Sequence, residues 1–171
     1  MSMQKYIEVY FSLIDKIDEL TPGDSIVATK SLSMAEEYLR DHFPKFPVMP
    51  GVLMIEAMTQ ASAWLVRVGE NFAHSVVVLK ETKNVKFGQF LQPGQTLVVT
   101  SKIVSDTENE TVVKAQGAIE GQVRIRAQLT LAKYNLADRS PHRACFDAKI
   151  VGRLKEELAL LWPDMPNPLA D

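Results

Sequence analysis

The chain has 171 residues, of which 46% are hydrophobic and 23% are charged, and its formal net charge is −2. The composition is typical of a globular protein, and the length indicates one domain. The small negative charge argues against a general nucleic-acid-binding protein. A single cysteine, Cys145, excludes an intrachain disulfide framework and suits a reducing compartment.

The first residues, MSMQKYIEVY, lack the architecture of a signal peptide, and no apolar run approaches the length of a transmembrane helix. We therefore expect a cytoplasmic protein that does not bind a membrane. A short helix is expected over residues 1–9, and strands over residues 10–19 and 25–31. A Pro-Gly turn at Pro22-Gly23 separates the two strands. Periodicity alone also allows an amphipathic helix over residues 5–20.

The next segment leads to the most apolar stretch of the chain. A short helix is expected over residues 33–39, with Ser33 as its cap and Glu36 completing a capping box. Three prolines between His42 and Gly51 then keep the chain out of helical conformations. This arrangement fixes His42 near the start of the following helix without regular structure.

A helix is expected over residues 52–68. Its apolar residues recur on all sides, which indicates a helix that is buried all round. The exceptions, Glu56, Thr59, Gln60 and Arg67, are spaced so that they form one narrow polar stripe. A carboxylate on a core helix is costly unless it is paired or used in chemistry. The N–H groups at Gly51, just before Glu56, lie at the positive end of the helix dipole and can polarise a bound carbonyl.

Strands are expected over residues 76–86, 96–105, 111–120 and 122–134, and a second Pro-Gly turn lies at Pro93-Gly94. Apolar and polar residues alternate along the later strands, which indicates a sheet with one buried face. The tail contains an amphipathic helix over residues 149–161, after which Pro163, Pro166 and Pro168 end regular structure. A buried helix followed by antiparallel strands is an α+β arrangement.

The stretch HFPKFPVMPGVLMIEAMTQ, residues 42–60, closely resembles the signature of the hotdog-fold 3-hydroxyacyl-[acyl-carrier-protein] dehydratases of fatty-acid synthesis. That signature reads roughly HFPxxPxMPGVLxxEAMxQ, and every fixed letter stands here at the same spacing. The resemblance extends upstream through SLIDKIDELTPGDSIVATKSLS and, more weakly, downstream to residue 134. It favours a strand for the second half of residues 5–20.

The resemblance implies a hotdog fold, in which a curved antiparallel sheet wraps around one long buried helix. It divides the chain into a dehydratase domain, residues 1–134, and a C-terminal extension, residues 135–171, whose helix packs on the domain or on a neighbouring subunit. It also implies a homodimer or a multiple of dimers, such as a trimer of dimers, with each active site shared between two subunits.

The resemblance assigns the general base to His42, the proton donor to Glu56 and the binding of the thioester carbonyl to the Gly51 N–H. Gln60 either orients Glu56 or the substrate, or simply fills the stripe. No cofactor and no metal are expected, because the substrate arrives on the phosphopantetheine of an acyl carrier protein and the sequence has no metal-ligand spacing. A basic surface for that acidic carrier is one interpretation of five residues: Lys80, Lys83, Lys86, Arg124 and Arg126. The other interpretation is that these residues simply lie on solvated faces of the strands.

Three features depart from the family pattern: Asp41 stands where glycine is common, FGQFLQPG replaces a more basic segment, and the C-terminal extension is longer than typical. They leave open the carrier and the choice between primary fatty-acid and specialised lipid synthesis. Two other classes on the same fold remain: an acyl thioesterase and a non-catalytic acyl-binding module. Retention of both His42 and Glu56 argues for dehydration.

Overall fold

The computed structural model describes residues 11–166, so the helix expected over residues 1–9 and the last proline, Pro168, lie outside the described residues. The regular elements, including three short 3₁₀ helices labelled η, are listed here in chain order: β1 Lys16–Thr21, β2 Ser25–Ser31, η1 Glu37–Arg40, α1 Gly51–Gly69, β3 Val76–Phe87, β4 Thr96–Asp106, β5 Glu110–Ile119, β6 Gln122–Tyr134, η2 Leu136–Asp138, η3 Pro141–Arg143 and α2 Ala144–Leu161.

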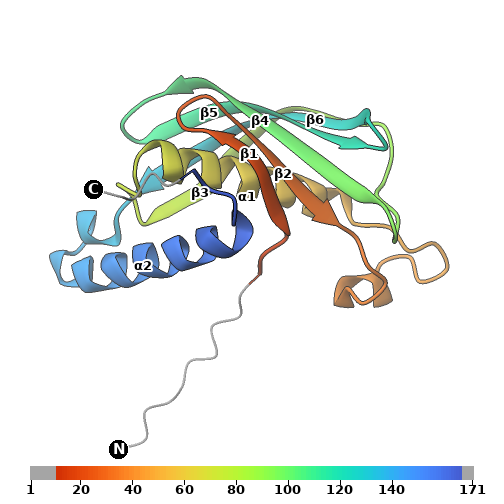
Figure 1. Cartoon of the computed structure of the whole chain (residues 1–171), viewed down its shortest axis with the longest axis horizontal. Helices are drawn as coiled ribbons and strands as arrows, with labels where there is room; N and C mark the ends of the chain where they lie inside the picture. The colour runs from red at the N-terminus through yellow and green to blue at the C-terminus, as the bar shows by residue number, and fades with distance from the viewer. Residues whose placement is uncertain (1–10, 167–171) are drawn as a thin grey trace, which may run out of the picture.

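All six strands form one antiparallel sheet in the order β1-β2-β4-β5-β6-β3. The sheet curves over α1, which lies against its inner face, and α2 lies below α1 in the view of Figure 1. The predicted α+β hotdog fold is confirmed. Because the chain passes from β2 through α1 to β3 at the far end of the sheet, β1 and β3 form the two sheet edges.

The predicted alternation of the later strands is also observed. Leu97 and Val99 of β4 and Ile125 of β6 are fully buried against the helix, while their sequence neighbours point outward. One buried polar contact joins the two layers, since the hydroxyls of Ser62 on α1 and Ser101 on β4 lie 2.8 Å apart. A buried hydroxyl needs such a partner, so this pair fixes the position of α1 on the sheet.

The start of the first strand was predicted incorrectly. The sequence favoured a strand over residues 10–19, but β1 covers Lys16–Thr21 and residues 11–15 have no regular structure. This segment is held by side chains: the Leu13 N–H donates to the Gln60 Oε1 at 2.8 Å, and the Asp15 carboxylate accepts the Ser31 N–H at 2.6 Å. Local periodicity contains no information about a partner 47 residues away.

The capping box expected at Ser33 and Glu36 was also wrong. The Ser33 hydroxyl accepts the Ala35 N–H at 3.2 Å, whereas the Glu36 carboxylate turns away and pairs with Lys30 at 2.6 Å. The Lys30 side chain is 5% exposed, so it requires a carboxylate partner. The η1 helix therefore begins later than predicted, at Glu37.

Helix α1 covers Gly51–Gly69, within one residue of the prediction at each end. Its middle is buried all round, as expected, but its first turn is not. The Val52 side chain is 72% exposed, so the prediction of complete burial fails at the N-terminal end of the helix. Exposed phenylalanines lie near this end as well, namely Phe43, Phe46 and Phe87. Of these, Phe87 packs against Gly51, the first residue of α1.

Helix α2 begins at Ala144, five residues before the predicted start. Its N-terminal turn is fixed by the Asp147 carboxylate, which accepts the Leu136 N–H at 2.8 Å and the Ala137 N–H at 2.9 Å. Its C-terminal end contributes Leu158 and Leu161 to the same core as α1 and the sheet. Neither of the two described α-helices is apolar and long enough to span a bilayer.

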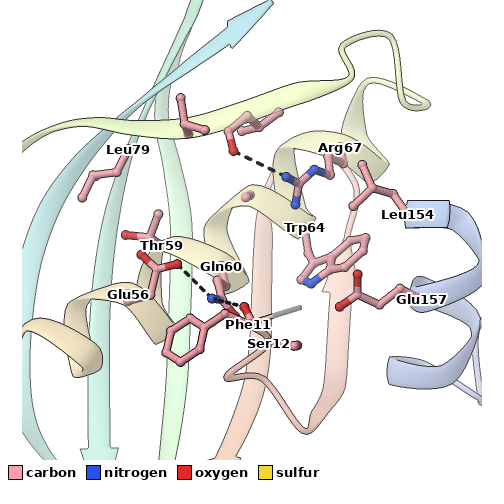
Figure 2. A pocket seen from close by; sticks show the side chains of 13 residues that line it. Phe11, Ser12, Glu56, Thr59, Gln60, Trp64, Arg67, Leu79, Leu154 and Glu157 are labelled. Carbon is pink, nitrogen blue, oxygen red and sulfur yellow. Dashed lines mark hydrogen bonds between the residues drawn. The ribbon is translucent and has the colours of Figure 1, made fainter. Parts of the chain in front are cut away.

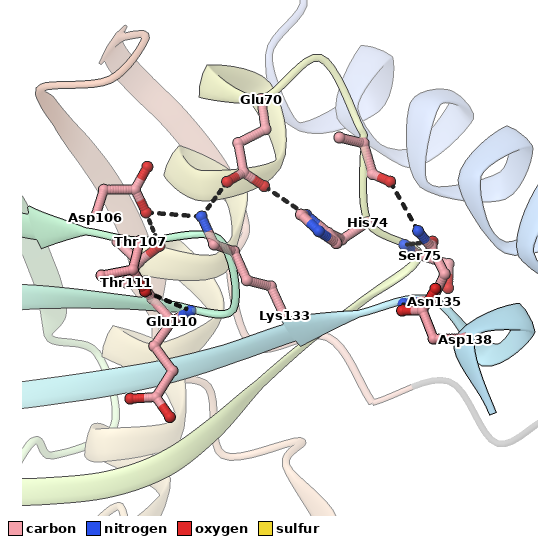
Figure 3. A network of polar contacts seen from close by, with 11 residues as sticks. Glu70, His74, Ser75, Asp106, Thr107, Glu110, Thr111, Lys133, Asn135 and Asp138 are labelled. Atoms are coloured by element: carbon pink, nitrogen blue, oxygen red, sulfur yellow. Dashed lines mark hydrogen bonds and ion pairs between the residues drawn. The ribbon is translucent and has the colours of Figure 1, made fainter.

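A buried lysine ties the end of α1 to the sheet (Figure 3). The Lys133 side chain of β6 is 1% exposed, and its ammonium group contacts Glu70, at the end of α1, and Asp106, at the end of β4, the latter at 2.7 Å. Glu70 also pairs with His74 at 2.9 Å. A buried ammonium is tolerated only when it is paired in this way, so Lys133 joins three elements.

Candidate active site

Glu56 lies one turn into α1 and lines a cavity of about 350 Å³ (Figure 2). The cavity runs along α1 and is bounded by β3, α2 and residues 11–12. All four members of the predicted polar stripe, Glu56, Thr59, Gln60 and Arg67, line it. The helical spacing therefore identified the polar residues that α1 contributes to the cavity.

Gln60 is hydrogen-bonded to the candidate proton donor. Its amide nitrogen donates to Glu56 Oε1 at 2.9 Å and to the Phe11 carbonyl at 3.2 Å, while its oxygen accepts the Leu13 N–H. Because the Leu13 N–H can only donate, these contacts fix the amide orientation. One oxygen of Glu56 is thereby held by Gln60, and Oε2 is the carboxyl oxygen left for a ligand.

His42 is positioned by a sharp bend between η1 and α1. The backbone N–H of His42 donates to the Tyr38 carbonyl at 3.2 Å. The next residue, Phe43, adopts a φ of 49°, a left-handed conformation that is uncommon for a bulky side chain. The two rings pack with their centroids 4.3 Å apart. Further on, the Met49 N–H donates to the Leu91 carbonyl at 2.8 Å and anchors the proline-containing segment.

The structure of one chain does not bring His42 and Glu56 together. His42 is not among the residues that line the Glu56 cavity, and in residues 11–166 no hydrogen bond links the two side chains. Both residues are nevertheless fixed in position.

Gly51 opens α1, with Pro50 as its N-cap. The Phe87 ring packs directly over Gly51, and a side-chain carbon added at this position would lie 3.0 Å from the ring. Glycine therefore allows this approach without a shift of the ring. The first N–H groups of a helix have no intrahelical acceptor, so they remain available to a ligand oxygen.

The other end of the cavity holds residues that sequence reasoning did not assign to the site: Trp64, Arg67, Leu154 and Glu157. Arg67 was noted only as a member of the polar stripe. The two α2 residues gave no sequence signal, because nothing in the amphipathic pattern of residues 149–161 shows which groove that helix covers. Among residues 11–166 no group of histidine, cysteine and acidic side chains is arranged to hold a metal ion.

A family model described as "FabA-like domain" matches residues 7–128. The chain belongs to the FabA-like family. Two bacterial relatives of this FabA-like chain carry the name 3-hydroxyacyl-[acyl-carrier-protein] dehydratase FabZ. The protein of Lactiplantibacillus plantarum is 38% identical over 117 residues, which are 68% of this chain and 80% of the relative. The protein of Ruminiclostridium cellulolyticum is 34% identical over 122 residues, which are 71% of this chain and 86% of the relative.

Solved structures share the fold of this FabA-like chain at low sequence identity. The dehydratase heterocomplex ApeI:P from Xenorhabdus doucetiae has a TM-score of 0.62 and 17% identity, covering 74% of this chain and 85% of that one. A hypothetical thioesterase with coenzyme A from Streptococcus pneumoniae has a TM-score of 0.53 and 13% identity, covering 69% and 86%. These likenesses concern the fold alone.

The FabA-like match, residues 7–128, contains His42, Gly51, Glu56, Gln60 and Arg67. It does not reach Leu154 and Glu157 of α2, which complete the cavity. The end of the cavity at Glu56 thus comes from the family domain, whereas the opposite end is partly built by residues beyond the match.

Proposed function

We propose that this protein removes water from a 3-hydroxyacyl thioester carried on an acyl carrier protein, giving the trans-2-enoyl thioester, in fatty-acid or related lipid synthesis. The observation that carries the proposal is the placement of Glu56. This residue belongs to a complete dehydratase motif, lines a cavity, and accepts a hydrogen bond from Gln60 through one carboxyl oxygen. The named relatives, which align over most of their length, support the same reaction.

In the proposed mechanism His42 removes the proton from C2, since histidine is the commonest general base near neutral pH. The Gly51 N–H stabilises the negative charge that develops on the thioester oxygen. Protonated Glu56 gives its proton from Oε2 to the hydroxyl at C3, the C3–O bond breaks, and the C2–C3 double bond forms as water leaves. His42 gains one proton and Glu56 loses one, so proton exchange resets the site without a cofactor.

We infer that His42 and Glu56 of each site come from two different subunits. The support is the separation of His42 from the Glu56 cavity, together with two uncovered surfaces. Strand β3 ends the sheet with one edge unpaired, and an open edge of this length is costly to leave exposed. The exposed side chains of Val52, in the first turn of α1, and of Phe87, which packs on Gly51, provide a further apolar contact for the same partner.

For the carrier we propose the basic outer face of the sheet. Of the five residues suggested by sequence, Lys80 pairs with Glu110 and Lys83 with Glu81, whereas Lys86 and Arg126 lie opposite each other on neighbouring strands. They line a hollow of about 510 Å³ that also contains Lys102 and Lys114, again opposite each other.

Like charges directly across a sheet are destabilising, so this basic face favours an acidic partner. In the described part of the chain, Lys86, Lys114 and Arg126 have no ion-pair partner. Lys86 also immediately precedes Phe87, the residue that packs on Gly51, so one end of the basic face reaches the start of α1. A carrier bound there lies beside the proposed thioester site.

The decisive experiment incubates the purified protein with a 3-hydroxyacyl carrier protein and measures the mass of the product. Loss of one water supports the proposal. A parallel incubation with a saturated acyl carrier protein tests the thioesterase alternative, for which release of the free thiol is the expected product. Binding of both substrates without any mass change would indicate the non-catalytic module and would overturn the proposed reaction.

A further inference from the structure

The cavity that begins at Glu56 ends at two ionisable groups that the dehydration does not use. Arg67 comes from α1, and Glu157 comes from α2 in the C-terminal extension. Both side chains lie beside Trp64 at the opposite end of the cavity from Glu56 (Figure 2). A purely aliphatic tunnel needs neither group.

Arg67 is a poorly satisfied cation. Its guanidinium makes one long hydrogen bond, from Nη2 to the Val77 carbonyl at 3.4 Å, and lies 5.2 Å from the centre of the Trp64 ring. Its Nε is buried without a partner. Across residues 11–166 it forms no ion pair. Burial lowers the pKa of Arg67 to about 10, so loss of water already disfavours its charged form.

Glu157 does not compensate that charge. The structure records no ion pair between Glu157 and Arg67 within its described residues, although both line the same space. Burial raises the pKa of Glu157, which favours the neutral carboxylic acid. A neutral carboxyl can donate a hydrogen bond, as a guanidinium can. Within the described residues Arg67 therefore has the Val77 carbonyl as an acceptor but no carboxylate as a counter-ion.

Both apolar and polar side chains line the cavity. Ala63, Trp64, Leu79 and Leu154 contribute apolar side chains to the lining, beside the polar Thr59 and Gln60. Glu56 and Arg67 are eleven positions apart on one helix, which corresponds to roughly 16 Å along its axis. An extended acyl chain with its C3 at Glu56 would place a distant carbon beside Arg67.

We propose that the cavity selects 3-hydroxyacyl groups whose far end carries a carboxylate, which Arg67 binds as its counter-ion. This inference rests on the proposed dehydration, because it specifies the substrate of the same site. A methyl-terminated chain of the same length buries Arg67 further without giving it an acceptor, so it binds less well.

The test compares two 3-hydroxyacyl pantetheine thioesters of equal length, one ending in a methyl group and the other in a carboxylate. A charged hydrogen bond contributes enough for roughly a tenfold or greater preference in kcat/KM for the carboxylate. Arg67→Met keeps most of the side-chain length and should reduce that preference at least about tenfold. The matched control is Arg139→Met, which also removes an arginine stacked on an aromatic ring, Tyr134, but outside the cavity. It should leave the preference unchanged.

A binding measurement on the wild-type protein keeps the proposal testable if Arg67→Met does not fold. The monomethyl ester of a long dicarboxylic acid should raise the Tm more than the dimethyl ester, since only the former carries a carboxylate. Equal turnover of the two thioesters, or equal Tm shifts by the two esters, would overturn the proposal. If neither thioester is dehydrated but the monoester still binds through Arg67, the proposed reaction fails and the binding site remains.

Discussion

The Gln60 side chain donates a hydrogen bond to Glu56 Oε1 at 2.9 Å and at the same time holds the backbone of residues 11 and 13. One amide thus connects the candidate proton donor to the N-terminal segment that borders its cavity. This geometry separates the two roles left open for Gln60 by the sequence, because a residue that merely fills a stripe needs no contact with Glu56. Orientation of Glu56 is the role we propose.

Replacing Gln60 by leucine should reduce both stability and turnover. The substitution leaves the Leu13 N–H without its acceptor, and we expect a loss of about 1–2 kcal/mol in the free energy of unfolding. It also frees Glu56, so kcat should fall more than KM changes. Denaturant unfolding and steady-state kinetics measure the two effects. Gln92→Leu, at an exposed turn, is the control, and equal effects of both variants would remove the special role of Gln60.

His42→Ala should fold normally and lose at least about 10²-fold in kcat, the usual contribution of a general base. Only the backbone N–H of His42 is bonded to Tyr38, so the fold does not depend on the side-chain nitrogens. Circular dichroism checks the fold and the water-loss assay checks the rate. His74→Ala, remote from the cavity, is the matched control. A His42 variant with near-wild-type turnover would exclude this residue from the mechanism.

Glu56→Gln should abolish turnover and leave substrate binding largely intact. An amide oxygen can still accept the Gln60 hydrogen bond, but an amide cannot supply the proton. Refolding a mixture of Glu56→Gln and His42→Ala chains then tests the shared site. Random pairing gives half mixed dimers with one intact site each, so activity should return to about a quarter of wild type. Mixing that is confirmed by mass and restores nothing would place both residues in the same subunit's site.

The Lys133 network predicts how stability depends on pH. Burial raises the pKa of Asp106, but hydrogen bonds from Lys133 and Thr111 outweigh it and hold that pKa below its usual 3.8. A lowered carboxyl pKa stabilises the fold above the unfolded value, and the contribution is lost as pH falls through the folded value. Burial lowers the pKa of Lys133, yet its two carboxylates raise it above 10.5, so its contribution is lost only in strong alkali.

Lys133→Met should therefore destabilise the protein at pH values between the pKa of Asp106 and the pKa of Lys133. It removes the cation that contacts both Glu70 and Asp106, and we expect a cost of about 2 kcal/mol at neutral pH. This is less than for a fully enclosed pair, because water reaches both carboxylates. The cost should shrink when acid protonates Asp106. Thermal unfolding as a function of pH measures it, and a cost that does not change on acidification would contradict the assignment to this network.

Reversing the charge of Lys114 should weaken use of the carrier without affecting the chemistry. Lys114→Glu opposes an acidic partner on the outer face, so kcat/KM for a carrier-bound substrate should fall about tenfold or more at low salt. For the pantetheine thioester of the same acyl group it should not change. Lys155→Glu, on α2, is the control. A loss that is equal for both substrates would assign Lys114 to folding and not to docking.

Local pattern was sufficient where the partners are close in sequence or where burial is periodic. The bounds of β2 and β6 agree with the prediction, and those of α1 lie within one residue of it. It failed where a side chain from another part of the chain decides the local conformation. Gln60 does so at residues 11–13, and Lys30 does so at Glu36. The site motif was readable from sequence, but its surroundings were not, since Glu157 lines the same cavity as Arg67 only because of the packing of α2.

The placement of α2 also bears on how enzymes of this kind diversify. The residues of the family domain supply the proposed chemistry, whereas Leu154 and Glu157 lie beyond the family match and shape the opposite end of the cavity. Altering substrate range by mutation inside a catalytic motif risks the reaction itself. A helix appended after the last strand can alter the substrate range without a change in the catalytic motif. The selectivity and the chemistry of such a chain can therefore evolve separately.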